Sequence, residues 1–221
     1  SSPFQNYCAN SLFDEGLLSH VVVEGGSSLV SEKVSGARIL KFFRKNYALL
    51  FNPFKLFFLV LNFFLHQKYH GDREIHNSRL LGKNFESLNP DLEMKQVSNI
   101  NSEECIEWIA KQEPGVVFVF GTSLIRQKLL SGIQCHFINM HWGWSPDYRG
   151  EGIISALALE GPYALGVTVH LIDLGIDSGE IISRLRPEVD ERDNFYSLGL
   201  KLCMLGTDLF KHAFYQFDQS G

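Results

Sequence analysis

The sequence lacks the cysteine pattern of a disulfide-rich or zinc-binding protein, and its first residues lack the pattern of a secretory signal peptide. Its cysteines are scattered along 221 residues with no CxxC pair among them: Cys8, Cys105, Cys135 and Cys203. Such spacing indicates neither a disulfide framework nor a zinc site. The opening Ser1-Ser2-Pro3 is followed by neither a basic region nor an apolar run. We therefore expect a reduced, cytoplasmic protein.

Positive charge is scarce as well. Lys and Arg number 20 against 25 Asp and Glu, which gives a net charge of -5 and a sequence pI near 5.9. Binding to a phosphate backbone depends on clustered basic charge. We therefore expect no nucleic-acid partner.

An unbroken hydrophobic run of membrane-spanning length is also missing. Many of the 18 Phe fall between residues 42 and 64, but Lys55 and Asn62 bracket the apolar stretch at the centre. A span needs about 20 mostly apolar residues. We expect a buried or interface helix here, with attachment to a membrane surface as the second interpretation and a true span as the third. His66 and His70 form an HxxxH pair, which fits two solvent-facing histidines better than a metal site.

What is present is an alternation of helix and strand patterns. Helical spacing of apolar residues predicts a helix over residues 3–16, and Ser102 followed by acidic residues predicts another that runs to about Gln112. Continuous apolar runs predict buried parallel strands at 20–23, 116–120, 134–138 and 167–172. A last helix follows Asp193-Asn194, with an apolar face of Phe195, Leu198, Leu202, Leu205 and Leu209. This order indicates an α/β protein.

Two polar side chains follow the strand that ends near Ile138. Asn139 and His141 stand where that strand runs into a turn-rich loop. Ligands of open α/β sheets bind at the carboxyl ends of the strands, so both side chains would project into the expected crevice. Taken alone, Asn-x-His at a strand end is explained equally well by a structural pair.

A second segment strengthens the functional interpretation. Residues 166–182 read as a strand, a Gly-containing loop with two carboxylates, and another strand. Asn-x-His, Pro-x-Tyr-Arg-Gly, Gly-Val-Thr-Val-His and Asp-x-Gly-x-Asp-x-Gly-x-Ile-Ile, in this order, resemble the signature of the folate-dependent formyltransferases. The resemblance is specific from about Val116 to Ile182. It implies a Rossmann-like domain with a mostly parallel sheet, helices on both faces and a C-terminal helix.

The resemblance assigns Asn139, His141 and Asp177 to the family's catalytic residues. An amide aimed at the oxyanion of a tetrahedral intermediate typically contributes about 3 to 4 kcal/mol to lowering the barrier. His141 would move a proton or help hold the oxyanion, and Asp177 would favour the charged imidazole. The competing interpretation of Asp177 is a turn aspartate bonded to its own backbone before Gly179. His136 and His170, inside strand-like runs, are interpreted as packed core histidines outside the site.

The same resemblance implies 10-formyltetrahydrofolate as co-substrate, with no metal. Its expected binding residues are Gly121, Thr122, Ser123, Leu124, Asp173 and Gly175. An ordinary strand-to-helix turn explains any single one of these positions equally well. Gly121 also makes physical sense as a strand end where backbone approaches a ligand.

The sequence departs from the family pattern after the histidine. Trp142 and Trp144 stand where many members have Ser-Leu-Leu-Pro, and they would stack on a flat ring or serve packing. Glu151 stands where some relatives carry a basic residue. We expect Trp142, Tyr148 and Arg149 to contact the acceptor substrate.

The acceptor expected from the resemblance is a nucleotide-linked amino deoxysugar used in surface polysaccharide, as for the sugar-nucleotide N-formyltransferases. A glycinamide ribonucleotide enzyme, a 10-formyltetrahydrofolate hydrolase and a non-enzymatic folate- or nucleotide-binding module are the alternatives. The low basic charge argues against a methionyl-tRNA formyltransferase.

The expected organisation is a catalytic domain over residues 1–192, with a helical insertion at about 36–80. A C-terminal helix at 193–221 would pack on the core or in a homodimer interface. Family members open with a central strand, whereas this sequence starts at what resembles the loop after it. We therefore expect residues preceding Ser1 to be missing from the sequence. The alternative is that another element takes the place of this strand.

Overall fold

The computed structural model describes residues 2–25, 86–150, 156–157 and 160–218. They belong to one compact unit made of residues 1–25 and 80–221. The expected insertion at about 36–80, the HxxxH pair and Glu151 lie outside the described residues. None of the described helices has the length and apolarity needed to cross a bilayer.

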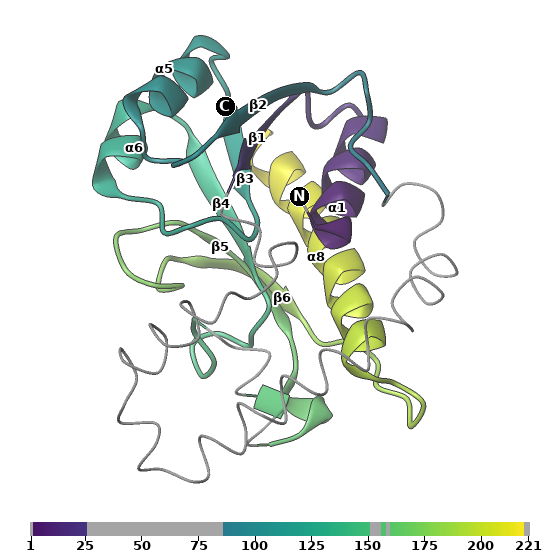
Figure 1. Ribbon diagram of the computed structural model, residues 1–221. Coiled ribbons are helices and arrows are strands. Elements are labelled where there is room, and N and C mark those ends of the chain that lie inside the picture. The colour runs from purple at the N-terminus through teal and green to yellow at the C-terminus, as the bar shows by residue number, and fades with distance from the viewer. Residues whose placement is uncertain (1, 26–85, 151–155, 158–159, 219–221) are drawn as a thin grey trace, which may run out of the picture. The chain divides into compact units, whose positions relative to one another are not determined.

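Two sheets of unequal size form the centre of this unit (Figure 1). Strands β1 (His20–Glu24) and β2 (Glu93–Val97) pair in parallel. The larger sheet has the order β3-β4-β5-β6, with β3 (Val116–Val119), β4 (His136–His141), β5 (Val167–Leu171) and β6 (Ile181–Leu185). The α/β, Rossmann-like fold class predicted from the sequence is confirmed.

The pairing directions within the larger sheet are mixed. β3 and β4 run in parallel, whereas β5 is antiparallel to both β4 and β6. The strand at 167–172 was therefore placed correctly, but its prediction as a parallel strand is wrong. An apolar run reports burial on both faces, and a buried antiparallel strand shares that property.

Helices cover both faces of the larger sheet (Figure 1). Helix α8 (Phe195–Asp218) packs on β4, β5 and β6, and α1 (Pro3–Asp14) packs beside it. Helix α5 (Glu103–Lys111) contacts α6 (Gln127–Gly132) on the other side, where residues of both pack against Val119 and Phe137.

Capping chemistry sets the helix ends that the sequence predicted. Ser2 caps α1 in a capping box with Gln5, and the Ser102 hydroxyl accepts from the backbone N–H of Cys105 at the start of α5. α8 begins after Asn194, whose side chain accepts from Tyr196 N and Ser197 N. The predicted apolar face of α8 is wrong for Phe195, which is 46% exposed. In the first turn of α8, Phe195 lies at the end of the buried face.

The alternation of side chains along β4 and β5 decides which residues can form a site. Ile138 and Met140 join Val167 and Val169 in the apolar cluster beneath α8. Because successive side chains of a strand point to opposite faces, the polar residues between them point the other way. These are Asn139 and His141 on β4, and Thr168 and His170 on β5.

Candidate active site

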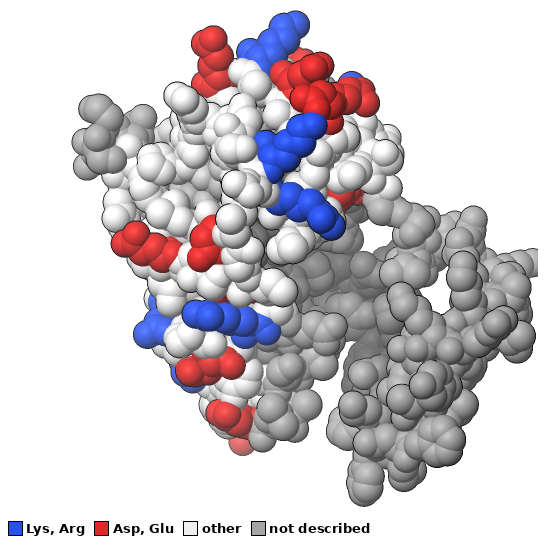
Figure 2. Space-filling model, turned by 90° about the vertical axis from the view of Figure 1, so that its left-hand side faces the viewer, with Lys and Arg blue, Asp and Glu red and all other residues white. Residues whose placement is uncertain are grey.

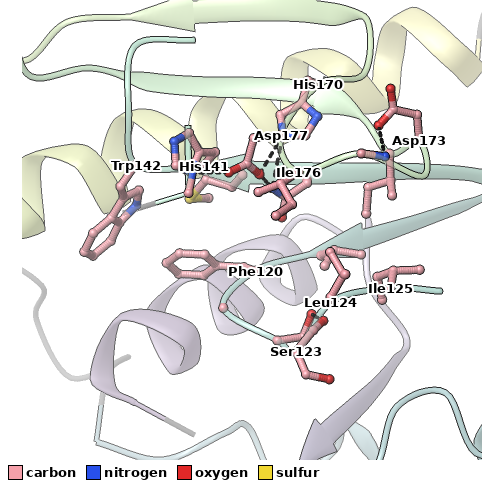
Figure 3. A pocket seen from close by; sticks show the side chains of 18 residues that line it. Phe120, Ser123, Leu124, Ile125, His141, Trp142, His170, Asp173, Ile176 and Asp177 are labelled. Carbon is pink, nitrogen blue, oxygen red and sulfur yellow. Dashed lines mark hydrogen bonds and ion pairs between the residues drawn. The ribbon is translucent and has the colours of Figure 1, made fainter. Parts of the chain in front are cut away.

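A cavity of about 360 Å³ opens at the carboxyl end of β4. Its wall includes the predicted catalytic residues Asn139, His141 and Asp177. Figure 3 shows His141 and Asp177 beside each other on this wall. It also includes all six positions predicted to bind the folate: Gly121, Thr122, Ser123, Leu124, Asp173 and Gly175. Segments far apart in the sequence thus meet around one space.

Asp177 is the centre of the polar contacts. Asn139 Nδ2 donates to Asp177 Oδ1 at 3.2 Å, and His141 Nδ1 lies 3.2 Å from Asp177 Oδ2. The backbone N–H of Gly150 donates to Oδ2 at 2.9 Å. Burial by itself would raise the pKa of Asp177, but the hydrogen bonds from His170 and Gly150 and the proximity of His141 outweigh it and hold that pKa below its ordinary value. The carboxylate is therefore the stable form.

His141 is held between two acceptors. Its Nε2 lies 2.7 Å from the carbonyl oxygen of Tyr148, while its Nδ1 faces the carboxylate of Asp177. A carbonyl oxygen only accepts, so Nε2 carries a hydrogen. A ring with a hydrogen on both nitrogens satisfies both neighbours. The arrangement thus places an imidazole and an amide side by side at Asp177, and both are groups that can stabilise a developing oxyanion.

The loop after β3 is held in place by hydrogen bonds to Glu24. Glu24 at the end of β1 accepts from Ser123 N at 2.8 Å, from Ser123 Oγ at 2.8 Å and from Ile100 N at 2.9 Å. Gly121 has φ +65°, and a Cβ there would lie 2.9 Å from Gln5 Nε2. The backbone conformation therefore favours Gly at position 121, and a Cβ there would require the end of the Gln5 side chain to shift. Glu24 was not among the predicted site residues, because it lies 99 residues from Ser123 and no local pattern connects the two.

The loop after β4 is fixed by a buried hydroxyl. Thr168 Oγ1 donates to Gly143 O at 2.7 Å and accepts from Ser145 N at 3.1 Å, and Thr168 itself is fully buried. This loop carries the carbonyl of Tyr148 toward His141. It also carries the N–H of Gly150 toward Asp177.

Of the three residues predicted to contact the acceptor, the structure brings one, Trp142, to the cavity wall. Trp142 lines the cavity, packs against Phe4 and Phe120, and has a buried indole N–H with no partner among the described residues. Tyr148 packs against the cluster that contains Leu165 and Leu198, and neither it nor the exposed Arg149 lines the cavity. Their acceptor contacts stay predictions.

Trp144 has a different environment from Trp142. The guanidinium groups of Arg184 and Arg186 each lie 4.3 Å from the centroid of its ring. Trp144 does not line the cavity. Its observed contacts support the packing interpretation rather than stacking on a ligand.

Two histidines differ from their sequence interpretation. His170 is buried as expected, at 3% exposed, but it lines the cavity and contacts Asn139 and Asp177. It therefore lies in the wall of the candidate site, although the sequence interpretation left it out of the predicted site residues. His136 was expected in the core, but it is exposed and stacks on Phe217. The signal that identifies His170 is its register, since it pairs directly with Asn139 across β4 and β5.

The remainder of the cavity wall is apolar. Phe120, Ile125, Ile172 and Ile176 line it together with Leu124, and Leu124 and Ile176 leave 54% and 61% of their surfaces exposed. Within the described part of the chain, no group of three His, Cys, Asp or Glu is arranged to hold a metal ion. An apolar pocket with a few convergent polar groups fits an organic co-substrate.

Comparison with known proteins supplies relatives by sequence. The chain is 29% identical over 150 residues to the bifunctional polymyxin resistance protein ArnA of Wigglesworthia glossinidia brevipalpis, covering 67% of this chain and 22% of that protein. It is 34% identical over 120 residues to the methionyl-tRNA formyltransferase of Bacillus velezensis, covering 53% of this chain and 38% of that protein. The chain thus spans well under half the length of these curated relatives.

A solved structure supports the fold. Glycinamide ribonucleotide transformylase 1 of Symbiobacterium toebii superposes with a TM-score of 0.60 at 15% identity, covering 100% of this chain and 84% of that one. The family model described as formyl transferase matches residues 75–213, which is more than half of the chain. With this match, the chain belongs to the formyl transferase family.

Proposed function

We propose that the protein transfers the formyl group of 10-formyltetrahydrofolate to an amino group, and that the acceptor is a nucleotide-linked amino sugar. The observation that supports formyl transfer most directly is the pair of contacts that Asp177 makes with Asn139 and His141, each at 3.2 Å. These contacts bring an amide, an imidazole and a carboxylate to one wall of a pocket. The family of the chain supplies the reaction class.

The pocket has features that suit a folate. Leu124 and Ile176 offer exposed apolar surface for a flat ring, and the loop at 121–123 offers backbone groups for polar contacts. When bound, 10-formyltetrahydrofolate supplies the formyl carbon that an amine attacks. Asn139 and charged His141 would then each turn one N–H from its protein acceptor to the oxygen on which negative charge develops. Asp177 would keep the imidazole charged and oriented.

The acceptor is the less constrained part of the proposal. Similarity to the polymyxin resistance protein ArnA and to methionyl-tRNA formyltransferases is compatible with more than one acceptor amine. The net charge of -5 disfavours tRNA. On the face seen in Figure 2, Lys and Arg are interspersed with Asp and Glu rather than gathered in a basic patch. A small nucleotide-linked amine needs no such patch.

The test measures tetrahydrofolate release from 10-formyltetrahydrofolate with and without an amine. The amines are dTDP-, UDP- and GDP-linked amino sugars, glycinamide ribonucleotide and methionyl-tRNA. We expect release to require an amine and to be fastest with one of the amino sugars. Full release without any amine would identify a hydrolase instead, and preference for the ribonucleotide or the tRNA would contradict the proposed acceptor.

Asn139→Ala is the variant that tests the oxyanion role in this assay. Loss of one such donor typically lowers kcat by about 100- to 1,000-fold. Asn99→Ala is the control, because Asn99 does not line the cavity. Unchanged turnover in Asn139→Ala would refute the assigned role.

A further inference from the structure

His170 is a buried titratable side chain for which the proposed reaction steps have no role. It lies on β5, directly opposite Asn139 in the register of the two antiparallel strands. Its side chain is 3% exposed and forms part of the cavity wall. The polar face of β5 therefore brings a second imidazole to the catalytic residues.

The backbone fixes the orientation of this ring. His170 Nδ1 lies 2.8 Å from the carbonyl oxygen of Leu171. Because a carbonyl only accepts, Nδ1 carries a hydrogen in both charge states of the ring. The variable nitrogen is Nε2, and Nε2 faces the catalytic side chains (Figure 3).

Nε2 contacts two catalytic side chains at once. It lies 3.1 Å from Asn139 Nδ2 and 3.4 Å from Asp177 Oδ1. A neutral ring accepts an N–H of the Asn139 amide, and a charged ring donates to the Asp177 carboxylate. The neutral ring thus fixes the orientation of the Asn139 amide, which must face the formyl oxygen. The charged ring fixes the orientation of the Asp177 carboxylate, which must face His141.

The neighbouring residue on this face of β5 has a comparable use. Thr168 bonds the loop that carries Tyr148 and Gly150 to the site, whereas Val167 and Val169 pack into the apolar cluster on the other face. The side chains on the polar face of β5 therefore bond residues of the site and of the loop beside it.

We propose that His170 is a positioning residue, which holds the Asn139 amide and the Asp177 carboxylate in the orientation needed for formyl transfer. The inference rests on the proposed function. His170 acts through Asn139 and Asp177 and needs no contact with substrate.

The charges around Asp177 define what removal of His170 changes. Among the described residues, His141 faces this carboxylate from β4 and His170 faces it from β5. Asp173 lies on the same loop, where it accepts from Gly175 N and Ser178 Oγ. Burial raises the pKa of Asp177 and the bond from His170 lowers it. The pKa of Asp177 should therefore rise when His170 is lost.

Two amide variants separate positioning from packing. In His170→Asn, the amide reaches the place of Nδ1, so it can keep the bond to Leu171 O but loses the contacts of Nε2. In His170→Gln, the longer side chain reaches the place of Nε2 and can bond Asn139 or Asp177. A purely structural role predicts that the Asn variant performs as well as the Gln variant.

The first readout is turnover with 10-formyltetrahydrofolate and the panel of nucleotide-linked amino sugars. For His170→Asn we expect kcat to fall about 10- to 100-fold, the cost of a small misplacement. The KM for the folate should change less than about threefold, because the lost contacts orient catalytic groups. His170→Gln should recover part of the loss. His136→Gln, an exposed histidine on β4, is the control and should leave turnover unchanged.

The second readout needs no substrate. The 13Cγ resonance of Asp177 is followed as a function of pH in the ligand-free protein, and its pKa should be higher in His170→Asn than in the wild type. If His170→Asn does not fold, the wild type carries the test through coupled titration of His170 ring nitrogens and Asp177. An unchanged pKa or uncoupled titration overturns the positioning role. Absence of formyl transfer in the wild type refutes the proposed function without affecting this measurement.

Discussion

At the residue scale, Asp177 combines an unusual backbone conformation with the central charge of the site. Its φ of +48° lies in the left-handed region, which Asp and Asn adopt more readily than other side chains. Asp177→Asn therefore keeps the loop and removes the charge beside His141. We expect kcat to fall by at least about 100-fold, the contribution of a well-placed acid or base, while the Kd for a folate changes little.

Steady-state kinetics and calorimetric titration with 10-formyltetrahydrofolate measure the two quantities for Asp177→Asn. Asp147→Asn, at an exposed position outside the cavity wall, is the matched control. A variant that loses affinity but keeps kcat would assign Asp177 to folate binding instead.

Thr168 is a second single residue with a testable role. Thr168→Val keeps the shape of the side chain but leaves Gly143 O and Ser145 N without their buried partner. An unsatisfied buried polar group costs about 1–3 kcal/mol, so the free energy of unfolding should fall by at least that amount. Urea denaturation measures the loss. Thr168→Ser keeps the hydroxyl and should lose less, and an equal or larger loss in Thr168→Ser would show that the methyl group matters at least as much as the hydroxyl.

At the scale of elements, the close approach of α8 to β4 depends on Gly206. A Cβ at Gly206 would lie 2.5 Å from Met140 Sδ, whereas a Cβ at Gly199 in the same helix would meet Phe4 and Trp142 at 3.5 Å or more. Ala is favoured over Gly in a helix by about 1 kcal/mol, and overpacking costs about 1–3 kcal/mol. We expect Gly199→Ala to be neutral or stabilising and Gly206→Ala to be destabilising.

The comparison of the two glycine variants uses urea denaturation and turnover together. Met140 lies between Asn139 and His141, so displacement of Met140 by Gly206→Ala should also lower kcat. Equal stability of the two variants would show that Met140 moves aside freely.

Glu24 joins the end of β1 to Ile100 and to Ser123, and its contribution to the free energy of unfolding should depend on pH. Burial raises the pKa of Glu24, but its bonds to Ile100 N, Ser123 N and Ser123 Oγ hold that pKa below its ordinary value. A lowered carboxyl pKa contributes stability above the unfolded value of about 4.3, and this contribution is lost as the pH falls through the folded value. Glu24→Gln should therefore be less stable than the wild type at pH 7, by about 1–3 kcal/mol.

Denaturation series at several pH values measure this difference. It should shrink as the pH falls below about 4, because the wild-type carboxylate becomes protonated there. Glu113→Gln, whose side chain makes none of these bonds, is the control. A difference that stays constant with pH would show that the carboxylate charge has no part in anchoring the Ser123 loop.

At the scale of the whole molecule, the buried cysteines can show whether the two large apolar clusters unfold together. Cys8 lies in the apolar cluster beneath α8, and Cys105 lies in the separate cluster around α5 and α6. Both are buried, and burial raises the pKa of the Cys8 thiol to about 12. If both clusters unfold together, both thiols should become reactive at the same urea concentration.

Labelling with an iodoacetamide and mass spectrometry measures this exposure for each cysteine. Cys135 is less buried and serves as the internal reference, although burial raises its pKa to about 11. Exposure of Cys105 at lower urea than Cys8 would show that the α5 and α6 side opens by itself.

Local patterns in the sequence determined much of the fold and the candidate site. Ser102 fixed the start of α5 because a capping hydroxyl acts within one turn. Alternation along residues 137–141 put Asn139 and His141 on one face because side chains of a strand alternate over adjacent residues. The spacing of the Asp-rich loop identified Asp177 through its resemblance to a family. Each of these signals lies within a few residues of the feature it describes.

Only the tertiary structure decided which distant segments meet. The antiparallel register of β5 against β4 put His170 opposite Asn139 and turned an apparent core histidine into part of the cavity wall. Glu24 reached Ser123 across 99 residues, and Phe195 fell outside the buried face of α8. Strand pairing and long-range hydrogen bonds depend on how elements pack, and that packing depends on contacts that no local pattern of residues specifies.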